Sequence, residues 1–445
     1  MPHFFTNNLQ DFSLPFSEGE FSFIGEFCHC AHQNTRVMLV RKNELLHTNE
    51  FFISIHTKSN AVLYKCQKST KPSPIGIAKD ALNILMQRSK QVLSHNLSPN
   101  SFAQQVISPF LLHKNAVLTF IIQRLHNTQP LHIEIGFGSG RHLLHLAKSN
   151  KNAVFLGVEI HTPSLQQVLR HIELLGLNNL YVTNLDARLL IELLAYQSVN
   201  AIYIHFPVPW LKKPHRRVIS KQFLQEISRV LKPTESSRAI HFTQNLQSGG
   251  FLHLRTDEEQ YANFTHNIAQ ELGFISYLSV DERASVISKY EARWRAKQKR
   301  IYDLFLAIAK NRQNFCHKNQ NLWHNTAFVF PKMSETIRRN VEDLIALFAS
   351  PASIGATKEQ GGLQEAIQKE AYFLHISAVY VGIHCTKGSF LLEVSLGDFG
   401  RAQNAFVLLD STNAIIRYVN APPLPTKATL KAHDLLVSIL ESKPI

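Results

Sequence analysis

The feature that most constrains the fold of this chain is an apolar run that ends in three alternating glycines. Residues 131–135 read Leu-His-Ile-Glu-Ile, then Gly136, Gly138 and Gly140 follow, and an apolar helical pattern begins directly after them. Glycines allow positive φ, and the N-terminus of the following helix offers free N–H groups to a ligand. The sequence therefore predicts a cofactor site at this turn.

The order strand, turn, helix repeats from residue 102 onward, which predicts βαβ units and a parallel sheet. The two ends of the chain instead hold short β-rich runs, a proline-rich turn and one amphipathic helix each. We therefore expect a central α/β domain over residues 100–310, flanked by α+β segments over 1–95 and 345–445. The likeness of the two ends has three explanations: an ancient duplication, two halves of one domain, or chance.

The composition favours a polyanionic partner. The 445 residues include 47 Lys and Arg against 33 Asp and Glu, a formal net charge of +14. The five cysteines are odd in number and scattered, which suits reduced thiols better than a disulfide framework. No uncharged apolar run reaches the roughly 18 residues of a membrane span, and the N-terminus lacks a leader pattern. We expect a cytoplasmic protein that binds no membrane, with a monomer as the favoured oligomeric state.

Two details of the glycine turn favour S-adenosylmethionine over a dinucleotide. The spacing is G-x-G-x-G, whereas dinucleotide folds use G-x-G-x-x-G. Glu134 lies two residues before the first glycine, where a carboxylate repels a pyrophosphate but attracts a sulfonium and an α-ammonium group. We therefore expect S-adenosylmethionine at Gly136, Gly138 and Gly140. A structural turn beside an incidental acid, and a dinucleotide-dependent oxidoreductase, are the alternatives.

Carboxylates end two further predicted strands. Glu159 follows an apolar run about 20 residues after the glycines, where an acid can accept hydrogen bonds from both ribose hydroxyls. Asp186 follows the next run and is placed to accept from an adenine amino group. A single acid at a strand end is often a helix cap, but three in register predict a cofactor site.

A rigid and basic segment follows the fourth predicted strand, residues 201–205. The strand stops at the string Phe206-Pro-Val-Pro-Trp210, and ligands in open α/β sheets bind at such strand ends. The stretch from Lys212 to Lys232 is strongly basic, which suggests that it holds a phosphate backbone over the site. A solvated helix face explains Arg229 and Lys232 equally well. The basic residues of this stretch are Lys212, Lys213, Arg216, Arg217, Lys221, Arg229 and Lys232.

Together these motifs resemble the bacterial tRNA (guanine-N7)-methyltransferase family. The resemblance covers about residues 100–310, less than half of the chain. It implies a Rossmann-like, class I S-adenosylmethionine-dependent methyltransferase domain that methylates N7 of a guanine in the variable loop of tRNA. The strings that carry it are Glu134-Ile-Gly-Phe-Gly-Ser-Gly140, Gly157-Val-Glu-Ile160, Asp186-Ala187, Phe206-Pro-Val-Pro-Trp210 with Lys212-Lys213 and Arg216-Arg217, Leu231-Lys-Pro233, Leu254-Arg-Thr-Asp257 and Ser288-Lys-Tyr-Glu291.

The resemblance also implies roles for single residues. Glu134, Glu159 and Asp186, with the glycine turn, would hold the cofactor. The implied tRNA-binding residues are Lys212, Asp257, Ser288, Lys289, Tyr290 and Glu291.

The residue types on the substrate side agree with these roles. Asp257 ends an apolar run and can accept from the N1–H and amino group of guanine, which leaves N7 free to attack. Glu291 can do the same, orient a basic neighbour, or form a helix-surface pair with Arg295. A second basic cluster suits phosphate contacts; its members are Arg293, Arg295, Lys297, Lys299 and Arg300.

Val208 departs from the family pattern, because members usually carry a catalytic Asp between the two prolines. Methylation at N7 removes no proton and requires no general base, so the transfer depends on proximity and orientation. We take Asp257 as the candidate catalytic carboxylate and expect a rearranged but active site. A catalytically silent RNA-binding protein is the alternative. Fifteen extra residues, Thr234–Ser248, and a slightly shorter basic loop are further departures.

Two lesser signals are interpreted structurally. Cys28 and Cys30 lack the usual zinc spacing and lie on alternate faces of a predicted strand, so we expect no metal site. His205 lies near the predicted reaction centre, but we interpret it as a strand histidine satisfied by its neighbours rather than a base.

Overall fold

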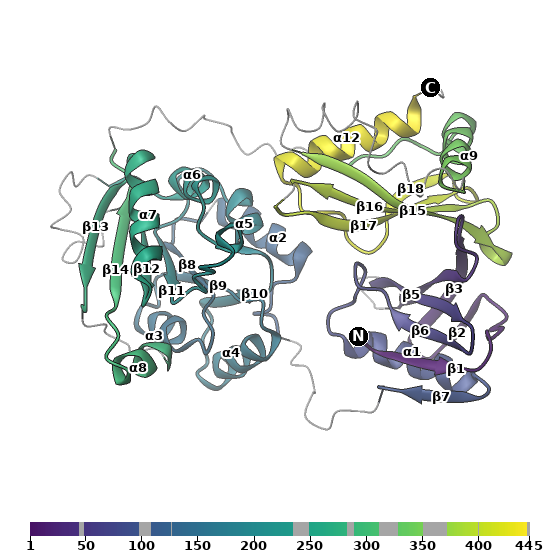
Figure 1. Ribbon diagram of the computed structural model, residues 1–445, viewed down its shortest axis with the longest axis horizontal. Coiled ribbons are helices and arrows are strands. Elements are labelled where there is room, and N and C mark those ends of the chain that lie inside the picture. Colours follow the sequence, from purple (N-terminus) through teal and green to yellow (C-terminus); the bar gives the residue numbers. More distant parts are fainter. Residues whose placement is uncertain are drawn as a thin grey trace. The chain divides into compact units, whose positions relative to one another are not determined.

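The computed structural model describes residues 1–43, 49–97, 108–125, 127–234, 249–282, 289–310, 328–349, 372–398 and 400–442. The chain forms two compact units (Figure 1). The central unit comprises Val106–Asn325, close to the predicted 100–310, and the terminal unit combines Met1–Gln105 with Thr326–Ile445. The segments 1–95 and 345–445, which we expected as two flanking parts, thus fold together.

Among the described residues, the central unit holds a seven-stranded sheet in the order β10-β9-β8-β11-β12-β14-β13. β8 to β12 run parallel, and β14 is antiparallel to both of its neighbours. The order reverses beside β8, so the carboxyl ends of β8 and β11 flank the topological switch point, where open α/β sheets bind ligands. The strands are β8 (Leu131–Ile135), β9 (Val154–Val158), β10 (Leu180–Thr183), β11 (Ala201–His205), β12 (Phe251–Thr256), β13 (Ile275–Val280) and β14 (Tyr302–Ala307).

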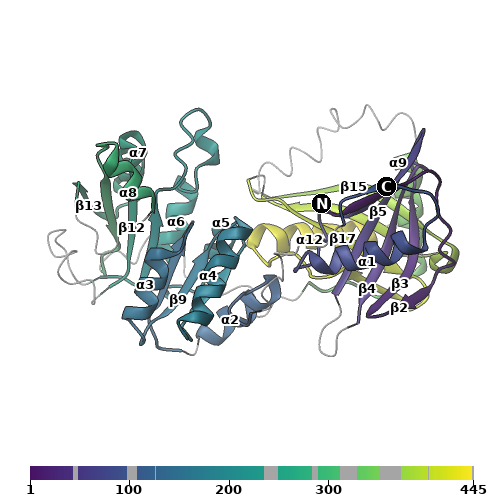
Figure 2. The same ribbon diagram turned by 90° about the horizontal axis from the view of Figure 1, so that it is seen from below.

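Helices cover both faces of this sheet, as the predicted βαβ units require. β9 is buried along its whole length, which is typical of a parallel strand covered on both sides. Figure 2 shows α3 and α4 on one face and α5, α6 and α7 on the other. The helices are α2 (Lys114–Leu125), α3 (Arg141–Ser149), α4 (Thr162–Leu174), α5 (Ala187–Leu193), α6 (Lys221–Val230), α7 (Glu259–Glu271) and α8 (Lys289–Ala296).

The terminal unit is built on one eleven-stranded sheet within the described residues. Its order is β18-β17-β16-β15-β3-β4-β5-β6-β1-β7, with β2 paired to β3. The two ends of the chain meet where β3 and β15 pair antiparallel, from Tyr380 opposite His29 to Ile383 opposite Glu26. The strands are β1 (His3–Thr6), β2 (Phe16–Glu18), β3 (Phe21–His29), β4 (Thr35–Lys42), β5 (Asn49–Lys58), β6 (Ala61–Cys66), β7 (Val92–His95), β15 (Phe373–Ile383), β16 (Phe390–Gly397), β17 (Gln403–Asp410) and β18 (Ile415–Tyr418).

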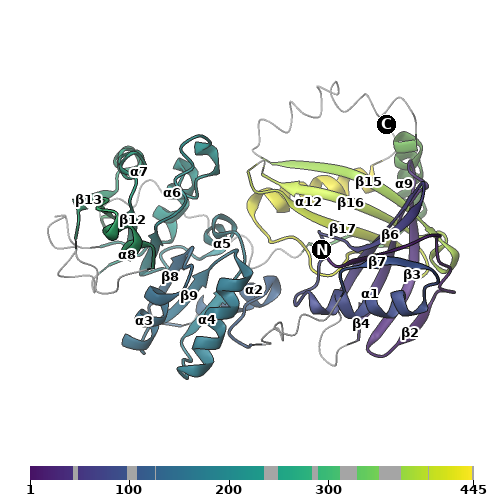
Figure 3. The ribbon, with the colours of Figure 1, turned by 60° about the horizontal axis from the view of Figure 1, so that its bottom comes forward.

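The two halves of this sheet repeat one pattern. Four consecutive antiparallel strands lead into a helix in each half: α1 (Gly76–Arg88) follows β3 to β6, and α12 (Lys427–Glu441) follows β15 to β18. In Figure 3 each helix lies along strands of its own half, and α9 (Glu335–Ala349) contacts α12. Phe52 and Phe406 join the halves in one core, with ring centroids 4.8 Å apart. The two similar end segments of the chain therefore form two halves of one domain.

Within the described part of the chain, no helix is both long and apolar enough to cross a membrane.

Candidate cofactor and substrate site

The three glycines of the turn between β8 and α3 all have positive φ: 72° at Gly136, 53° at Gly138 and 71° at Gly140. A Cβ atom at Gly136 or Gly138 would meet no other atom within 4 Å, so the first half of the turn faces open space. At Gly140 a Cβ would lie 2.2 Å from Cγ2 of Val168 on α4. The first two glycines thus leave bare backbone for a ligand, and the third allows α3 to pack against α4.

Glu134 lies at the carboxyl end of β8 and is only 3% exposed. Its Oε2 atom lies 2.8 Å from Nδ1 of His142, in the first turn of α3. The buried carboxylate therefore has a hydrogen-bond partner that fixes its position beside the glycine turn.

Glu159 follows β9 and closes the other side of the turn. Its Oε2 atom accepts from the backbone N–H of Gly138 at 3.0 Å, and its Oε1 atom accepts from the N–H of His161 at 2.9 Å. A carboxylate oxygen can accept more than one hydrogen bond, so both oxygens retain capacity for ribose hydroxyls. The structure brings Glu134, Glu159 and the glycine turn together as the sequence predicted.

Asp186 follows β10 and acts as the N-cap of α5. Its side chain accepts from the backbone N–H of Arg188 at 2.8 Å, and the Arg188 guanidinium binds the same carboxylate at 3.0 and 2.6 Å. An adenine contact therefore has to share this carboxylate with Arg188, and the predicted role of Asp186 stays a prediction.

Asp257, the candidate catalytic carboxylate, directly follows β12. Its Oδ2 atom lies 2.6 Å from Nζ of Lys299, and its side chain is 15% exposed. The same Lys299 ammonium lies 4.1 Å from the ring centroid of Trp294 on α8. Lys299, predicted as a phosphate contact, thus neutralises Asp257 in this structure.

Glu291 lies on α8 and is 1% exposed. Its Oε1 atom lies 3.3 Å from Nη2 of Arg255, and Nε of Arg255 lies 3.4 Å from Oδ1 of Asp303. Of the three predicted roles, the structure shows the one in which Glu291 orients a basic neighbour. The side chain of Arg295 lies outside the described residues, so the predicted pair of Glu291 with Arg295 stays a prediction.

Three of the predicted substrate residues cannot be placed in this way. Ser288 lies outside the described residues, as do the side chains of Lys289 and Tyr290. Residues 235–248, most of the extra segment, are also outside them.

The segment after β11 is held in an unusual backbone conformation. Phe206 and Trp210 have φ values of 51° and 44°, and between them Val208 is 61% exposed. Nε of Arg217 donates to the carbonyl of Pro209 at 2.8 Å, which ties this segment to the 3-10 turn Pro214–Arg216. Val208 therefore presents an apolar side chain to solvent at the position that the family usually fills with Asp.

Two members of the predicted basic loop have structural roles instead, which corrects the sequence-based grouping. Arg217 is 7% exposed and packs over Tyr261 and Phe264. Arg229 donates to the backbone carbonyls that end α5 and pairs with Glu226. The basic side chains of the loop that are exposed are Lys212, Lys213, Arg216 and Lys221.

Sequence reasoning missed a group of partly buried histidines at the switch point. Nε2 of His205 lies 3.2 Å from Nδ1 of His253, which confirms that His205 is satisfied by a neighbour. Nε2 of His253 lies 2.8 Å from Oδ1 of Asp303, and the rings of His142 and His205 are 4.5 Å apart. Burial lowers the pKa of His205 well below its ordinary value, and it also lowers the pKa of His253. The signal available in the sequence was a histidine in each of two neighbouring strands, His205 at the end of β11 and His253 in the middle of β12.

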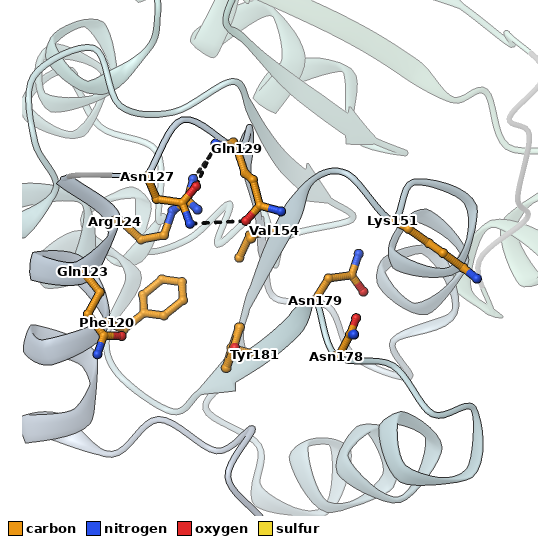
Figure 4. A pocket seen from close by; sticks show the side chains of 10 residues that line it. All are labelled: Phe120, Gln123, Arg124, Asn127, Gln129, Lys151, Val154, Asn178, Asn179 and Tyr181. Carbon is orange, nitrogen blue, oxygen red and sulfur yellow. Dashed lines mark hydrogen bonds between the residues drawn. The ribbon is translucent and has the colours of Figure 1, made fainter.

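The pocket in Figure 4 is separate from this site. It has a volume of about 320 Å³ and lies at the amino ends of β9 and β10, between Phe120 of α2 and Tyr181. Nδ2 of its residue Asn179 donates to the carbonyls of Ala147, Asn150 and Ala153. This amide therefore holds neighbouring segments of the chain together.

Comparisons with known proteins agree with the geometry. A family model described as "Putative methyltransferase" matches residues 128–236. The tRNA (guanine-N(7)-)-methyltransferase of Helicobacter hepaticus is 37% identical over 99% of this chain and 99% of its own length. The protein of the same name from Wolinella succinogenes is 34% identical over 98% of this chain and 99% of its own. The chain belongs to the tRNA (guanine-N(7)-)-methyltransferase family. Both matches include the terminal unit, so these relatives share it.

Among solved structures, a SAM-dependent methyltransferase from Aquifex aeolicus is 14% identical, with a TM-score of 0.27, over 43% of this chain and 88% of that one. A TM-score this low adds nothing to the fold evidence from the strand order and the family. The central unit has the Rossmann-like fold of a class I methyltransferase, and S-adenosylmethionine is its cofactor. The site fits this cofactor, because a buried carboxylate, a second carboxylate and an open glycine turn meet at one sheet edge.

Proposed function

We propose that this chain transfers a methyl group from S-adenosylmethionine to N7 of a guanine in the variable loop of tRNA, in the cytoplasm. The observation that carries the proposal is that Glu134, Glu159, Asp257 and the open glycine turn all lie at the carboxyl ends of strands β8, β9 and β12, on one edge of the central sheet. The whole-length relatives that bear this activity in their names support it.

Methylation of guanine N7 requires the protein to orient the base and the cofactor, and it requires no proton transfer. S-adenosylmethionine, when bound, supplies a methyl group on a positively charged sulfur. Guanine N7 has a free lone pair, so holding the base in line with that methyl group is the main task of the protein. Glu134 and Glu159 hold the cofactor end. Asp257 accepts from the N1–H and amino group of guanine, and Lys299 moves from Asp257 toward a phosphate.

The charge distribution supports tRNA contacts through the central unit. Residues 106–325 contain 26 Lys and Arg against 15 Asp and Glu, whereas the terminal unit contains 21 against 18. A phosphate backbone is drawn to the unit with the larger positive excess. Lys212, Lys213 and Arg216 are exposed beside the site and are the first candidates for these contacts.

The proposal is tested with purified protein, unfractionated tRNA and S-adenosylmethionine that carries a labelled methyl group. We expect saturable transfer of label to tRNA. Binding of the cofactor without transfer to any tRNA would favour the alternative, a catalytically silent RNA-binding protein.

The substitution Val208→Asp separates these alternatives directly. We expect it to change kcat/KM for tRNA methylation by less than about threefold, because Val208 is exposed and N7 methylation needs no base. The initial rate of Val208→Asp is compared with that of Val208→Asn, because asparagine has the size of aspartate without its charge. A gain of about 100-fold from near-zero activity, more than a surface substitution provides, would mean that the natural protein is silent.

The neighbours Arg216 and Arg217 should have opposite phenotypes. Arg216 is exposed, 5.2 Å from the Trp210 ring, so we expect Arg216→Ala to weaken tRNA binding about three- to tenfold and to lower the salt slope by about 1. Arg217→Ala removes a buried hydrogen bond and should lower the free energy of unfolding by about 2–3 kcal/mol. Filter binding at several salt concentrations and urea titrations measure both. Equal effects of the two substitutions on tRNA binding and on the free energy of unfolding would contradict these separate roles.

A further inference from the structure

Three side chains of the metal-ligating type converge at the switch point. One donor atom from each of Glu134, His142 and His205 lies within 4.8 Å of the other two. Glu134 lies near the carboxyl end of β8, His142 in the first turn of α3 and His205 at the end of β11, so three separate elements contribute. Within the described part of the chain, no other group of three His, Cys, Asp or Glu side chains comes so close together.

The hydrogen bonds around the two histidines leave a lone pair on each ring. Asp303 accepts from Nε2 of His253, so Nδ1 of His253 accepts from Nε2 of His205. Nδ1 of the neutral His205 ring then carries a lone pair. Glu134 accepts from Nδ1 of His142, so Nε2 of the neutral His142 ring carries another. No hydrogen bond among the described residues reaches either of these two nitrogens. A metal ion can accept both lone pairs.

The surroundings of His205 suit a metal ligand. Burial lowers its pKa well below the ordinary value, and neighbouring groups, Arg255 among them, lower it further. The ring is therefore neutral, as a ligand must be. Its other nitrogen is held by His253, which Asp303 fixes at 2.8 Å. Ligating histidines are typically oriented by such a second hydrogen bond.

The donor set favours zinc over the common hard cations. Two imidazoles and one carboxylate are the protein ligands of many zinc sites, which leave a fourth position open. Mg²⁺ and Ca²⁺ prefer oxygen ligands, so a site with two imidazoles does not suit them. Tetrahedral zinc places its ligand atoms about 3.4 Å apart. The three side chains therefore have to close by roughly 1 Å around the ion, within the reach of small side-chain rotations.

We propose that Glu134, His142 and His205 bind one Zn²⁺ ion, and that this ion and S-adenosylmethionine exclude each other. The exclusion rests on the proposed contact between Glu134 and the cofactor. A carboxylate that ligates zinc no longer faces the α-ammonium and sulfonium groups, and the charge of the ion repels the net positive charge of the cofactor. Zinc thus regulates methyl transfer by keeping the cofactor out.

The proposal is tested on the full chain after treatment with a chelator and dialysis. Calorimetric titration with ZnCl2, in a buffer that does not bind zinc, should show one ion per chain, and MgCl2 should show no binding. S-adenosylmethionine at about 100 times its Kd should raise the apparent Kd for zinc about 100-fold, because the two ligands compete for the free protein.

Two substitutions locate the ion. His142→Asn and His205→Gln keep an N–H donor toward Glu134 and His253 but lose the second ring nitrogen. Each should weaken zinc binding by at least about 10- to 100-fold, which is the cost of losing even an outer partner of a ligand. His145→Gln, at an exposed position of α3, should bind zinc as the natural protein does. Binding of S-adenosylmethionine by His205→Gln shows that this variant is folded.

The possible results separate the zinc site from the cofactor assignment. Absence of zinc binding to the natural protein, which needs no variant to fold, would overturn the proposal, as would zinc binding that both variants retain. Zinc binding that both variants lose but that S-adenosylmethionine leaves unchanged would overturn the exclusion and contradict the cofactor contact of Glu134. If the metal-free protein bound no S-adenosylmethionine, the cofactor assignment would be contradicted and the exclusion would fall with it.

Discussion

Replacing Asp257 by alanine should lower kcat/KM for tRNA methylation by about 100- to 1,000-fold, because it removes the proposed acceptor of two guanine donors. Hydrogen bonds to a carboxylate contribute about 1.5–3 kcal/mol each, and about 1.4 kcal/mol corresponds to a factor of ten in rate. Asp257→Asn should retain part of the activity, since an amide oxygen still accepts. Initial rates at subsaturating tRNA measure the effect.

Two controls separate the guanine contact from other roles of Asp257. Glu271→Gln removes an exposed carboxylate of α7 that pairs with Lys221, and it should leave the rate within about twofold. Lys299→Ala removes the partner of Asp257 and should cost far less than Asp257→Ala. If Lys299→Ala were equally damaging, Asp257 would serve to hold Lys299. A loss below about tenfold in Asp257→Ala, less than one such hydrogen bond, would contradict the proposed guanine contact.

The substitution Glu134→Gln should raise the Kd for S-adenosylmethionine by about 30- to 100-fold, because it removes the buried charge that we propose faces the cation. The glutamine oxygen can still accept from His142, so the fold should be retained. The effect on S-adenosylhomocysteine should be smaller, since that ligand lacks the sulfonium. Calorimetric titrations with both ligands measure the two changes.

A surface control accompanies Glu134→Gln. Glu173 lies exposed on α4, and Glu173→Gln changes the net charge of the protein equally. It should leave both affinities unchanged. An unaltered Kd in Glu134→Gln would mean that this carboxylate serves only to position His142.

The local parts of the site were predictable from the sequence. The glycine turn and Glu159 each follow a strand that its apolar run identifies, and Glu134 lies near the end of the first of these strands. Parallel strands bring their carboxyl ends to one edge of the sheet. The position of Asp257 at this edge was predictable for the same reason, because it directly follows the apolar run of β12.

The partners of these residues were not predictable, because they come from distant parts of the chain. Lys299 pairs with Asp257 although α7, β13 and α8 lie between them in the sequence, and Arg255 of β12 pairs with Glu291 of α8. Arg217 is buried beside the exposed Arg216, a difference that charge patterning does not reveal. The pairing of β3 with β15 joins the two ends of the chain, and such long-range pairing leaves no local signal.

The most direct test of the central claim is to locate the transferred methyl group. tRNA is incubated with the protein and S-adenosylmethionine that carries a deuterated methyl group, and its nuclease fragments are analysed by mass spectrometry. We predict labelled 7-methylguanosine in the fragment that contains the variable loop, and a sharp loss of this signal in Asp257→Ala. Label on another atom or in another loop, or no label despite saturable cofactor binding, would contradict the account.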